Sequence, residues 1–456
     1  MPAAPFAAAA FALYLAVGLV RYDTGRSGNY DLGIFAQAAQ RWSEGRWPGS
    51  AIRGLDNLFA DHFSPITALF GLAWRLCADP RALVVTQALA LAAAVLVVAA
   101  AAFRHLPPVL AASLTVGVIL AKGAVSAAVF DVHETGLGAP LMAGLAVGLL
   151  ERRRPVVVGC ALGLLLVKED LGLTVVVAGL LWWRLAGERR TGLLLVAAGV
   201  VGLAVAFGVV LAVSPEHSTP YLQFLTGASG NAQGLPGTGV TGGHRWEPIL
   251  LFAATAGLVG LRSPIALLAA PTLAWRFVSS NEAYWQTYFH YDVLLVPIAA
   301  VALVDVLAGR PAARGQQVVA LAALGVAAAL GVVKLAAWPL LDPAAYRLSP
   351  QLGAATRLAA QLPAGDAVAV QQELGPVFVA GHDVRMLSTL PAGPVRWVVL
   401  TPQGSSLGAS ASAKQVWLAA QAGRAEVTSS DGITVVRLPA PEVVQLPADA
   451  VSAPRP

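Results

Sequence analysis

Charged residues are scarce in this chain. Asp, Glu, Lys and Arg make up 12% of its 456 residues, whereas an average soluble domain carries ~25%. Apolar residues make up 57%, and the mean hydropathy is +0.68. Uncharged stretches such as residues 193–213 can cross the ~30 Å hydrocarbon core of a bilayer as helices. Because lipid offers no partner to backbone polar groups, these stretches must be helical, and a soluble globular fold is excluded.

Cysteine is scarcer still. Cys77 and Cys160 both lie in apolar segments, which argues against a disulfide and leaves no metal-ligand spacing. The net charge is +5, but the basic residues form short clusters between apolar blocks instead of a stripe that could bind nucleic acid. We therefore expect membrane lipids as partners and no nucleic acid. The first apolar block lacks the basic start and cleavage site of a signal peptide, so we expect it to be a retained span.

Long apolar blocks predict an α-helical polytopic membrane protein of a bacterial inner membrane. We expect about eleven transmembrane helices, at residues 6–20, 82–103, 107–121, 136–150, 155–167, 171–185, 192–213, 249–261, 264–278, 291–308 and 316–336. Residues 64–78 are apolar too, but this segment is short enough either to span or to lie flat as an amphipathic interfacial helix.

Basic clusters decide where residues 64–78 lie. If this segment lies flat and the N-terminus is cytoplasmic, then Arg104, Arg262 and the clusters at 151–154, 184–190 and 310–314 all fall in cytoplasmic loops, as the positive-inside rule requires. The acids and histidines then gather on the outer face, where we expect the functional site. The first outer loop departs from the rule, because it carries Arg21, Arg26, Arg41, Arg46 and Arg53.

Composition divides the chain into parts. Residues 1–340 are expected to form the transmembrane domain, with outer loop 1 at about 21–81 and juxtamembrane helices in it. Residues 341–439 read as a small extracytoplasmic α/β domain, with strands at 367–371, 397–401 and 433–438, a helix at 410–422 and a hairpin turn at 430–432. The Pro-rich residues 440–456 are expected to be a disordered tail.

Outer loop 1 carries an acidic residue, Asp31, that could act in catalysis. Asp31 lies about ten residues beyond the first predicted span, and Asp31, Phe35 and Gln37 suit a short helix on the membrane surface. One interpretation is a carboxylate held at the membrane–water boundary as a base. The alternative is an ordinary solvated loop acid, which the segment alone does not exclude.

Asp131, His133 and Glu134 stand just before the predicted span at 136–150. Histidines and acids at the mouth of a span can bind a substrate or relay a proton. The alternative is helix capping, with acids at the positive end of the helix dipole. Residues 237–242 match a G-x-G-x-x-G pattern, but we reject a dinucleotide site because no strand precedes them. We interpret residues 227–243 as a flexible outer loop of the length that substrate gates have.

Two further polar runs interrupt the apolar blocks. Lys168, Glu169 and Asp170 either place a Lys–Glu pair toward a polar cavity or form a tight outer turn between two short spans. His290 and Tyr291 open the predicted span at 291–308. Aromatic residues there fit an interfacial belt, whereas His290 adds a donor that a phosphate or a sugar hydroxyl could use.

Five short segments stand out when taken in order: Tyr30-Asp31-Leu32-Gly33-Ile34-Phe35-x-Gln37, Asp61-His62-Phe63-x-Pro65, Phe130-x-x-His133, Lys168-Glu169-Asp170 and His290-Tyr291. This ordered set resembles DUF2079, a family of bacterial predicted membrane proteins. The resemblance runs from the first loop to the C-terminal domain and covers most of the chain.

The layout also resembles the wider GT-C class of membrane glycosyltransferases. That resemblance implies a large first outer loop with juxtamembrane helices, an acid early in that loop, and a polyprenyl-phosphate sugar as donor. Asp31 matches the acid, and Asp61, His62 and Pro65 stand where related enzymes carry a short motif leading back to the membrane. Leu32 follows Asp31, so the acidic dipeptide of the best-known members is missing. This argues against a metal at Asp31, although a divalent cation (Mg²⁺ or Mn²⁺) elsewhere stays open.

The combined hypothesis is a transferase that moves a sugar from a polyprenyl-phosphate donor to a glycan, lipid or protein acceptor of the cell envelope. Asp31 would be the base of an inverting single displacement, and phosphate would be met by cations or donors. The candidates for substrate binding are Gln37, Asp61, His62, His133, Glu134, Lys168, Glu169, Arg245, His290 and Tyr291; Lys168, Arg245 and His290 are those for phosphate.

Two other classes of function stay open. A transporter or lipid flippase should show internal repeats and polar groups in mid-membrane; the polar residues of this chain flank its apolar blocks instead. A non-catalytic envelope assembly protein would use its C-terminal domain to bind a partner. A pocket open to the bilayer on the outer face would favour the enzyme, and a mid-membrane cavity reachable from both sides would favour transport.

Overall fold

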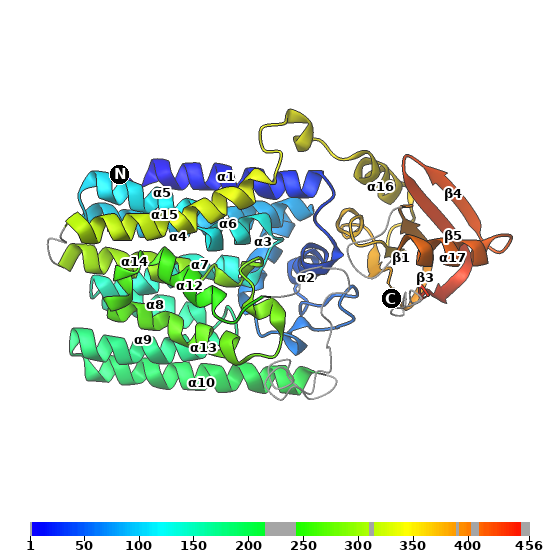
Figure 1. Ribbon diagram of the computed structural model, residues 1–456. Helices are drawn as coiled ribbons and strands as arrows, with labels where there is room; N and C mark the ends of the chain where they lie inside the picture. The colour runs from blue at the N-terminus through cyan, green and yellow to red at the C-terminus, as the bar shows by residue number, and fades with distance from the viewer. Residues whose placement is uncertain (1, 215–242, 310–313, 389–391, 403–409, 448–456) are drawn as a thin grey trace, which may run out of the picture.

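The computed structural model describes residues 2–214, 243–309, 314–388, 392–402 and 410–447. Its larger part is a bundle of roughly parallel helices, and a mixed sheet with two helices lies beyond one end of this bundle (Figure 1). The predicted G-x-G-x-x-G run and almost all of the predicted gate loop lie outside the described residues. The arrangement confirms a helical membrane protein with a C-terminal α/β part.

The bundle contains helices at all of the predicted apolar blocks. Five are long and apolar enough to span a membrane alone, and α5 (Pro108–Leu120) with α6 (Lys122–Val129), bent by 41°, makes a sixth. The five are α1 (Ala4–Asp23), α4 (Pro80–His105), α10 (Arg189–Val213), α14 (Leu295–Gly309) with the turn before it, and α15 (Arg314–Ala336). Shorter apolar helices are α7 (Glu134–Leu150), α8 (Arg154–Leu164), α9 (Leu171–Ala186), and η5 (Pro264–Ala269) with α13 (Ala270–Val278).

One predicted span is broken. Residues 249–261 were expected to form one helix, but α12 (Glu247–Thr255) ends early. Gly257 and Leu258 follow with positive φ values of 60° and 57°, a conformation that no α-helix accommodates. A short 3₁₀ turn, η4 (Val259–Arg262), completes the segment. The number of spans therefore lies between five and eleven.

Small residues let α9 and α10 approach closely. Gly172 and Gly179 on α9, and Gly192 and Gly199 on α10, are each separated by two helical turns and so lie on one face. A Cβ atom on Gly172 would lie 2.7 Å from the carbonyl oxygen of Gly199, and one on Gly179 would lie 2.6 Å from that of Gly192. Close backbone approach through small residues is a common way for helices to associate in lipid.

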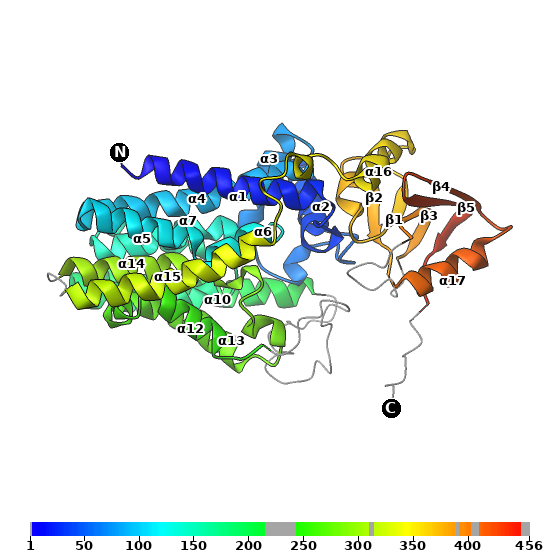
Figure 2. The same ribbon diagram turned by 45° about the horizontal axis from the view of Figure 1, so that its top comes forward.

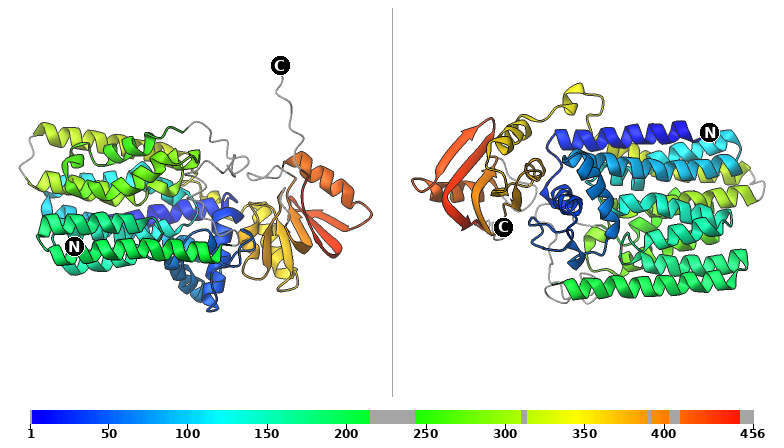
Figure 3. Two further views of the ribbon diagram at one scale, coloured as in Figure 1. Left: turned by 90° about the horizontal axis from the view of Figure 1, so that it is seen from below. Right: turned by 180° about the vertical axis from the view of Figure 1, so that it is seen from behind.

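The polar loops gather at one end of the bundle, which we call the loop-1 end. It comprises residues 24–79, 130–133, 165–170 and 279–294, and the sheet lies beyond it (Figures 1 and 3). Two short helices there, α2 (Ile34–Ser43) and α3 (Ala68–Leu76), run across the direction of the long helices (Figure 3). α3 exposes Leu72 and Leu76 at its surface. This is the arrangement expected for an interfacial helix at 64–78.

Arg104, Arg262 and the basic clusters at 151–154 and 184–190 lie at the opposite end of the bundle, whereas the loop-1 arginines lie at the loop-1 end. Each of the five loop-1 arginines contacts a partner at its own end of the bundle, and Arg21, Arg46 and Arg53 are each paired with a carboxylate. The contacts are Arg21 with Asp131 (2.8 Å), Arg53 with Asp61 (2.9 Å), Arg46 with Glu44 (3.0 Å), Arg41 with the carbonyl oxygen of Trp47 (2.8 Å), and Arg26 above the ring of Trp338 (5.0 Å).

The sheet has the strand order β2-β1-β3-β5-β4. β1 (Ala367–Val370) is parallel to β2 (Asp383–Met386) and β3 (Pro394–Leu400), whereas β5 (Ile433–Val443) is antiparallel to β3 and β4 (Glu426–Ser430). Alternate residues of β1 and β3 pack on opposite faces, as the strand period requires. One face meets α16 (Pro350–Gln361), and the other meets α17 (Ala411–Gln421) (Figure 2).

The start of the disordered tail was predicted too early in the sequence, at residue 440. Proline content suggested disorder from residue 440, but β5 stays paired with β3 through Val443. Val444 and Leu446 after it are buried in the core of the α17 face. Apolar side chains at these positions supply enough burial to hold residues 440–447 in place, which the composition alone did not reveal.

Loop 1 is hydrogen-bonded to the parallel strands β1 and β2. The Asn29 side chain donates to the carbonyl oxygen of Val370 (3.0 Å), and its backbone N–H donates to that of Gln372 (2.7 Å). The Gln37 side chain donates to the carbonyl oxygen of Val384 (2.8 Å). A single apolar core joins α2, α3, α16 and the sheet. The segment that carries the acid of loop 1 is therefore fixed between the bundle and the sheet.

Candidate functional site

A chain of charged groups runs through the loop-1 end. The Nε2 atom of His133 lies 3.5 Å from Oδ1 of Asp31, and its Nδ1 atom lies 3.9 Å from Oε2 of Glu134. The other oxygen of Glu134 accepts a hydrogen bond from Lys168 Nζ (3.2 Å). The structure thus brings together an acid of loop 1, the start of α7 and the turn before α9, all of which the sequence had suggested separately.

Two histidine rings stack beside this chain. The ring centres of His133 and His290 lie 3.4 Å apart with 20° between the planes, and Phe130 packs against both. Both histidines are buried, yet His133 Nε2 and His290 Nδ1 have no hydrogen-bond partner among the described residues. Buried polar atoms are usually paired. His290 Nδ1, which has no hydrogen-bond partner among the described residues, and His133 Nε2, which has only the 3.5 Å contact with Asp31, therefore mark a place where a substrate could bond.

Asp31 has an unusual backbone. Its φ of 73° and ψ of −86° lie close to the strained three-residue γ-turn with positive φ, and such strain gathers at functional sites. The carboxyl group is about one-fifth exposed (19%). Burial raises its pKa to about 6, against the opposing charges of His133 and Arg21. A carboxylate with this pKa is suited to accept a proton near neutral pH.

A second group lies beside the first. Nδ1 of His62 bonds to Oε1 of Glu169 (2.7 Å), while the backbone N–H of Phe63 donates to Oε2 (3.1 Å). Arg53 pairs with Asp61 (2.9 Å). Loop 1 is in this way joined to the turn between α8 and α9, which brings the Asp61–His62 segment to the Lys168–Glu169 pair.

Electrostatics keep these groups charged. Burial lowers the pKa of Lys168, but the carboxylates of Glu134 and Glu169 outweigh burial and raise it above its ordinary value. Burial raises the pKa of Glu169, but His62 and Lys168 outweigh it and lower it. The pKa of His62 is raised by Glu169 and Asp61 in spite of burial and of Lys168. The site therefore holds positive and negative charges together in a largely dry environment.

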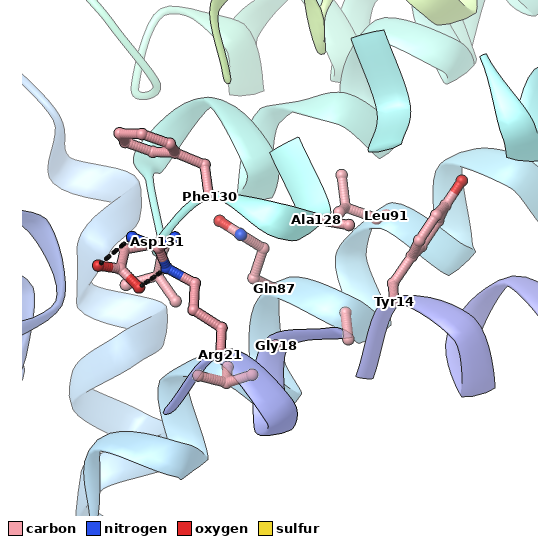
Figure 4. Close-up of a pocket in the computed structure, with 11 residues that line it drawn as sticks. Tyr14, Gly18, Arg21, Gln87, Leu91, Ala128, Phe130 and Asp131 are labelled. Carbon is pink, nitrogen blue, oxygen red and sulfur yellow. Dashed lines mark hydrogen bonds and ion pairs between the residues drawn. The ribbon is translucent and has the colours of Figure 1, made fainter. Parts of the chain in front are cut away.

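Arg21 and Asp131 anchor the segment that carries His133. Arg21 Nε donates to Asp131 Oδ1 (2.8 Å), and the Ser27 hydroxyl donates to the same oxygen (2.7 Å). The pair borders a narrow cavity that extends along α1 and α4 past Gln87 and Tyr14 (Figure 4). Gln87 accepts from the backbone N–H of His133 (2.7 Å). These contacts fix where the His133 ring stands relative to Asp31.

Several residues at the candidate site were not predicted from the sequence. Trp275 donates to Asp170 (3.0 Å), and the buried Arg276 pairs with Asp292 (2.6 Å) and donates to the carbonyl oxygen of Tyr284 (2.8 Å). A usable signal existed for Arg276, because it is an arginine within an apolar segment and such residues are seldom left unpaired. Arg21 and Arg53 also carried a signal, as arginines that broke the positive-inside pattern.

Three predicted residues stand apart from the chain of charges. Both ends of the Gln37 amide are bonded within the protein, since its oxygen accepts from the Ser50 hydroxyl (2.7 Å) and its nitrogen bonds to β2. Arg245 is exposed and lies above the ring of Trp285 (4.5 Å). The ring of Tyr291 contacts that of His290, with centres 4.4 Å apart. Gln37 thus serves the junction between loop 1 and the sheet.

No metal-holding group emerges in the described part of the chain. Among those residues, no set of three or more His, Cys, Asp or Glu side chains is arranged to hold a metal ion. The carboxylates of the site are instead matched with Lys168, His62 and His133.

Comparison with solved structures defines the class of fold. Two crystal structures of ArnT from Cupriavidus metallidurans match nearly the whole chain: that of the protein bound to undecaprenyl phosphate (TM-score 0.59, 15% identity) and that of its apo state (TM-score 0.54, 16% identity). Each match covers 95% of this chain and 97% of the other. The protein therefore has an ArnT-like GT-C fold, with a mixed sheet at its C-terminal end.

Residues 21–389 match the family described as predicted membrane protein DUF2079. The chain belongs to this family. No curated protein matches it.

Proposed function

We propose that this protein is a glycosyltransferase that moves a sugar from a polyprenyl-phosphate donor to an acceptor of the cell envelope. One observation carries the proposal. Asp31, a strained and partly buried carboxylate with a pKa of about 6, stands 3.5 Å from the ring of His133, which stacks on the ring of His290. It does so in a fold that follows, over 95% of the chain, a protein crystallised with undecaprenyl phosphate.

The reaction we propose is a single displacement with Asp31 as base. A carboxylate oxygen of Asp31 takes the proton of an acceptor hydroxyl as the acceptor oxygen bonds to the anomeric carbon of the sugar. The bond from that carbon to the phosphate oxygen breaks, and its electron pair leaves with the polyprenyl phosphate. Attack and departure on opposite sides invert the anomeric carbon. Because phosphate is a good leaving group, a strong general acid is not required.

Groups around Asp31 would orient the reactants and balance the charge. His133, 3.5 Å from Asp31, would hold the carboxylate and share the proton it takes up. Lys168, His290 and Arg245 are the proposed phosphate contacts, which stabilise the charge that grows on the leaving group. Asp61, His62, Glu134, Glu169 and Tyr291 would shape the pocket for the sugar and its phosphate.

We propose that the loop-1 end faces outward. The loops at the opposite end carry Arg104 and the basic clusters at 151–154 and 184–190, as cytoplasmic loops do. The N-terminus of α1 lies at that opposite end, and the sheet lies beyond the loop-1 end (Figure 1). The N-terminus would then be cytoplasmic and the α/β domain extracytoplasmic, with donor and acceptor both met on the outer side.

The experiment is a turnover assay in proteoliposomes with a panel of polyprenyl-phosphate sugars and envelope acceptors. We expect one donor to yield free polyprenyl phosphate and a product of inverted anomeric configuration. Retained configuration would contradict the single displacement. Protein-dependent movement of lipid across the bilayer without any cleavage of the sugar–phosphate bond would contradict the transferase and support a flippase.

A further inference from the structure

Two lysines of the membrane part bond to neighbouring neutral side chains and form no ion pair with any acid that the structure describes. Lys122 opens α6, and Lys334 lies in the last turn of α15. Lys122 Nζ donates to the Thr287 hydroxyl (2.5 Å), and Lys334 Nζ donates to the Ser126 hydroxyl (3.0 Å). Ser126 in turn donates to the carbonyl oxygen of Thr287 (3.1 Å). The two ammonium groups therefore share one small network of neutral oxygens.

This network is short of negative charge. Among the described residues no carboxylate forms an ion pair with either lysine. The carboxylate of Asp292, in the same segment as Thr287, is bonded to Arg276 (2.6 Å). Cations inside a membrane protein are costly and almost always paired. These two partly buried cations, of which Lys334 also donates to the carbonyl oxygen of Tyr288, have neutral partners only and leave positive charge that a bound anion could balance.

The lysines do not simply extend toward the water. A lysine that only snorkels keeps its charged head in solvent, whereas these two turn onto Ser126 and Thr287 within the bundle. Lys334 also lies over the ring of Tyr288, with Nζ 4.2 Å from the ring centre. Trp338 follows just beyond the end of α15, beneath the guanidinium of Arg26. Aromatic and basic side chains of this kind mark the headgroup level of a bilayer.

An apolar path leads away from the site along α15. Its members are exposed and spaced so that they share one face of the helix, which runs toward the opposite end of the bundle: Val333 (70% exposed), Leu330 (44%), Val326 (57%) and Val319 (46%). A ligand with a phosphate at the lysines and a long hydrocarbon chain along this face would match both features.

We propose that Lys122 and Lys334 bind a phosphate carried on a lipid. The proposal rests on the proposed function for its link to the reaction. Thr287 lies three residues before His290, whose ring stacks on His133 beside Asp31. The segment 287–290 thus separates the lysine site from the catalytic carboxylate. After the sugar has been transferred at Asp31, the polyprenyl phosphate product would bind at the two lysines, on the other side of segment 287–290.

The test measures binding of sugar-free lipids to the purified full chain in phosphatidylcholine nanodiscs. The probes are polyprenyl phosphate, phosphatidylglycerol and the uncharged polyprenol. The variants are Lys122→Gln/Lys334→Gln, the charge-conserving Lys122→Arg/Lys334→Arg, and Arg75→Gln as a control. Arg75 is an exposed arginine of α3 at the same end of the bundle.

We expect the wild type to bind polyprenyl phosphate at least about tenfold more tightly than polyprenol. The double glutamine variant should lose about 10- to 100-fold of this affinity, as expected for two charge-assisted hydrogen bonds. The double arginine variant should keep most of it, and the control should bind like the wild type. Comparing phosphatidylglycerol with polyprenyl phosphate tells which lipid the site selects.

Equal binding of polyprenol and polyprenyl phosphate would overturn the proposal. So would an unchanged affinity in the double glutamine variant, or the same loss in Arg75→Gln. Melting temperatures show whether the glutamine variant is folded, and the arginine variant tests the charge if it is not. Because no sugar takes part, a protein without transferase activity would still show this binding. If the lysine variants turn over the donor as fast as the wild type does, the transferase proposal stands, but the lysine site takes no part in that reaction.

Discussion

Replacing Asp31 by Asn should stabilise the protein. In the folded chain burial raises the pKa of this carboxyl from its ordinary value of 3.8 to about 6, so ionisation costs the folded state free energy. At pH 7.5 that penalty is about 3 kcal/mol, because each tenfold change in proton affinity corresponds to about 1.4 kcal/mol. Asparagine carries no charge and tolerates positive φ as well as aspartate does, so Asp31→Asn removes the penalty without adding strain.

The sign of the pH dependence follows from linkage. Well below pH 3.8 the carboxyl group is protonated in the folded and the unfolded chain alike, and little is gained by the substitution. Between pH 4 and 6 the unfolded chain ionises first, so the stability of the wild type falls relative to the variant. The advantage of Asp31→Asn should therefore grow from less than about 1 kcal/mol at pH 4 to about 3 kcal/mol at pH 7.5.

Denaturation of the purified protein in detergent, followed at both pH values, measures this difference. Asp56→Asn is the matched control, because Asp56 is an exposed acid of the same loop and should change stability by less than about 0.5 kcal/mol. A variant Asp31→Asn that is less stable than the wild type at pH 7.5 would refute the reasoning. A stability difference that does not change between pH 4 and pH 7.5 would refute it as well.

The remaining predictions concern residues that stabilise the fold through an ion pair, hydrogen bonds or close helix packing. Lys168→Gln should destabilise the protein by about 3–5 kcal/mol, because it leaves the Glu134 carboxylate buried without its cation; thermal unfolding should show part of this loss restored in Lys168→Gln/Glu134→Gln. Gln37→Ala should cost about 1–3 kcal/mol by leaving buried partners in loop 1 and β2 unpaired, and limited proteolysis should detect a loosened sheet. Gly331→Ala should lower the melting temperature, since its Cβ would overlap the carbonyl oxygen of Leu120; an unchanged melting temperature would contradict this packing.

Apolar length predicted the helices of the membrane part well. A helix that crosses lipid must satisfy its backbone internally, so uncharged blocks such as 193–213 could hardly become anything but helices, and α10 (Arg189–Val213) is one. The break after Thr255 escaped prediction, because residues 253–261 stay apolar while Gly257 and Leu258 leave the helical conformation. Hydropathy reports on burial in lipid and carries no information on backbone φ.

The α/β part was predicted where strands alternate clearly. β1, β3 and the start of β5 were expected, but β2 has the sequence Asp-Val-Arg-Met and β4 is exposed along its whole length. β2 owes its place to pairing with β1, and β4 owes its place to pairing with β5. Tertiary partners of this kind cannot be read from a short polar segment.

The candidate site was predicted as a set of residues but not as a geometry. Asp31, His133, Glu134 and Lys168 were each singled out from polar residues beside apolar blocks, and the fold brings them within contact of one another. The close stack of His133 on His290 depends on how α6, α7 and the 287–292 segment pack. Gln37 was expected to meet substrate, yet its contacts lie between loop 1 and the sheet.

The most direct test of the central claim is sugar transfer from a polyprenyl-phosphate donor by the wild type, Asp31→Asn and Asp56→Asn, run side by side at pH 7.5. We expect turnover by the wild type and the Asp56 variant, and a loss of about 10²- to 10⁴-fold in a folded Asp31→Asn protein. Transfer at the wild-type rate in Asp31→Asn would contradict the assignment of Asp31 as the base.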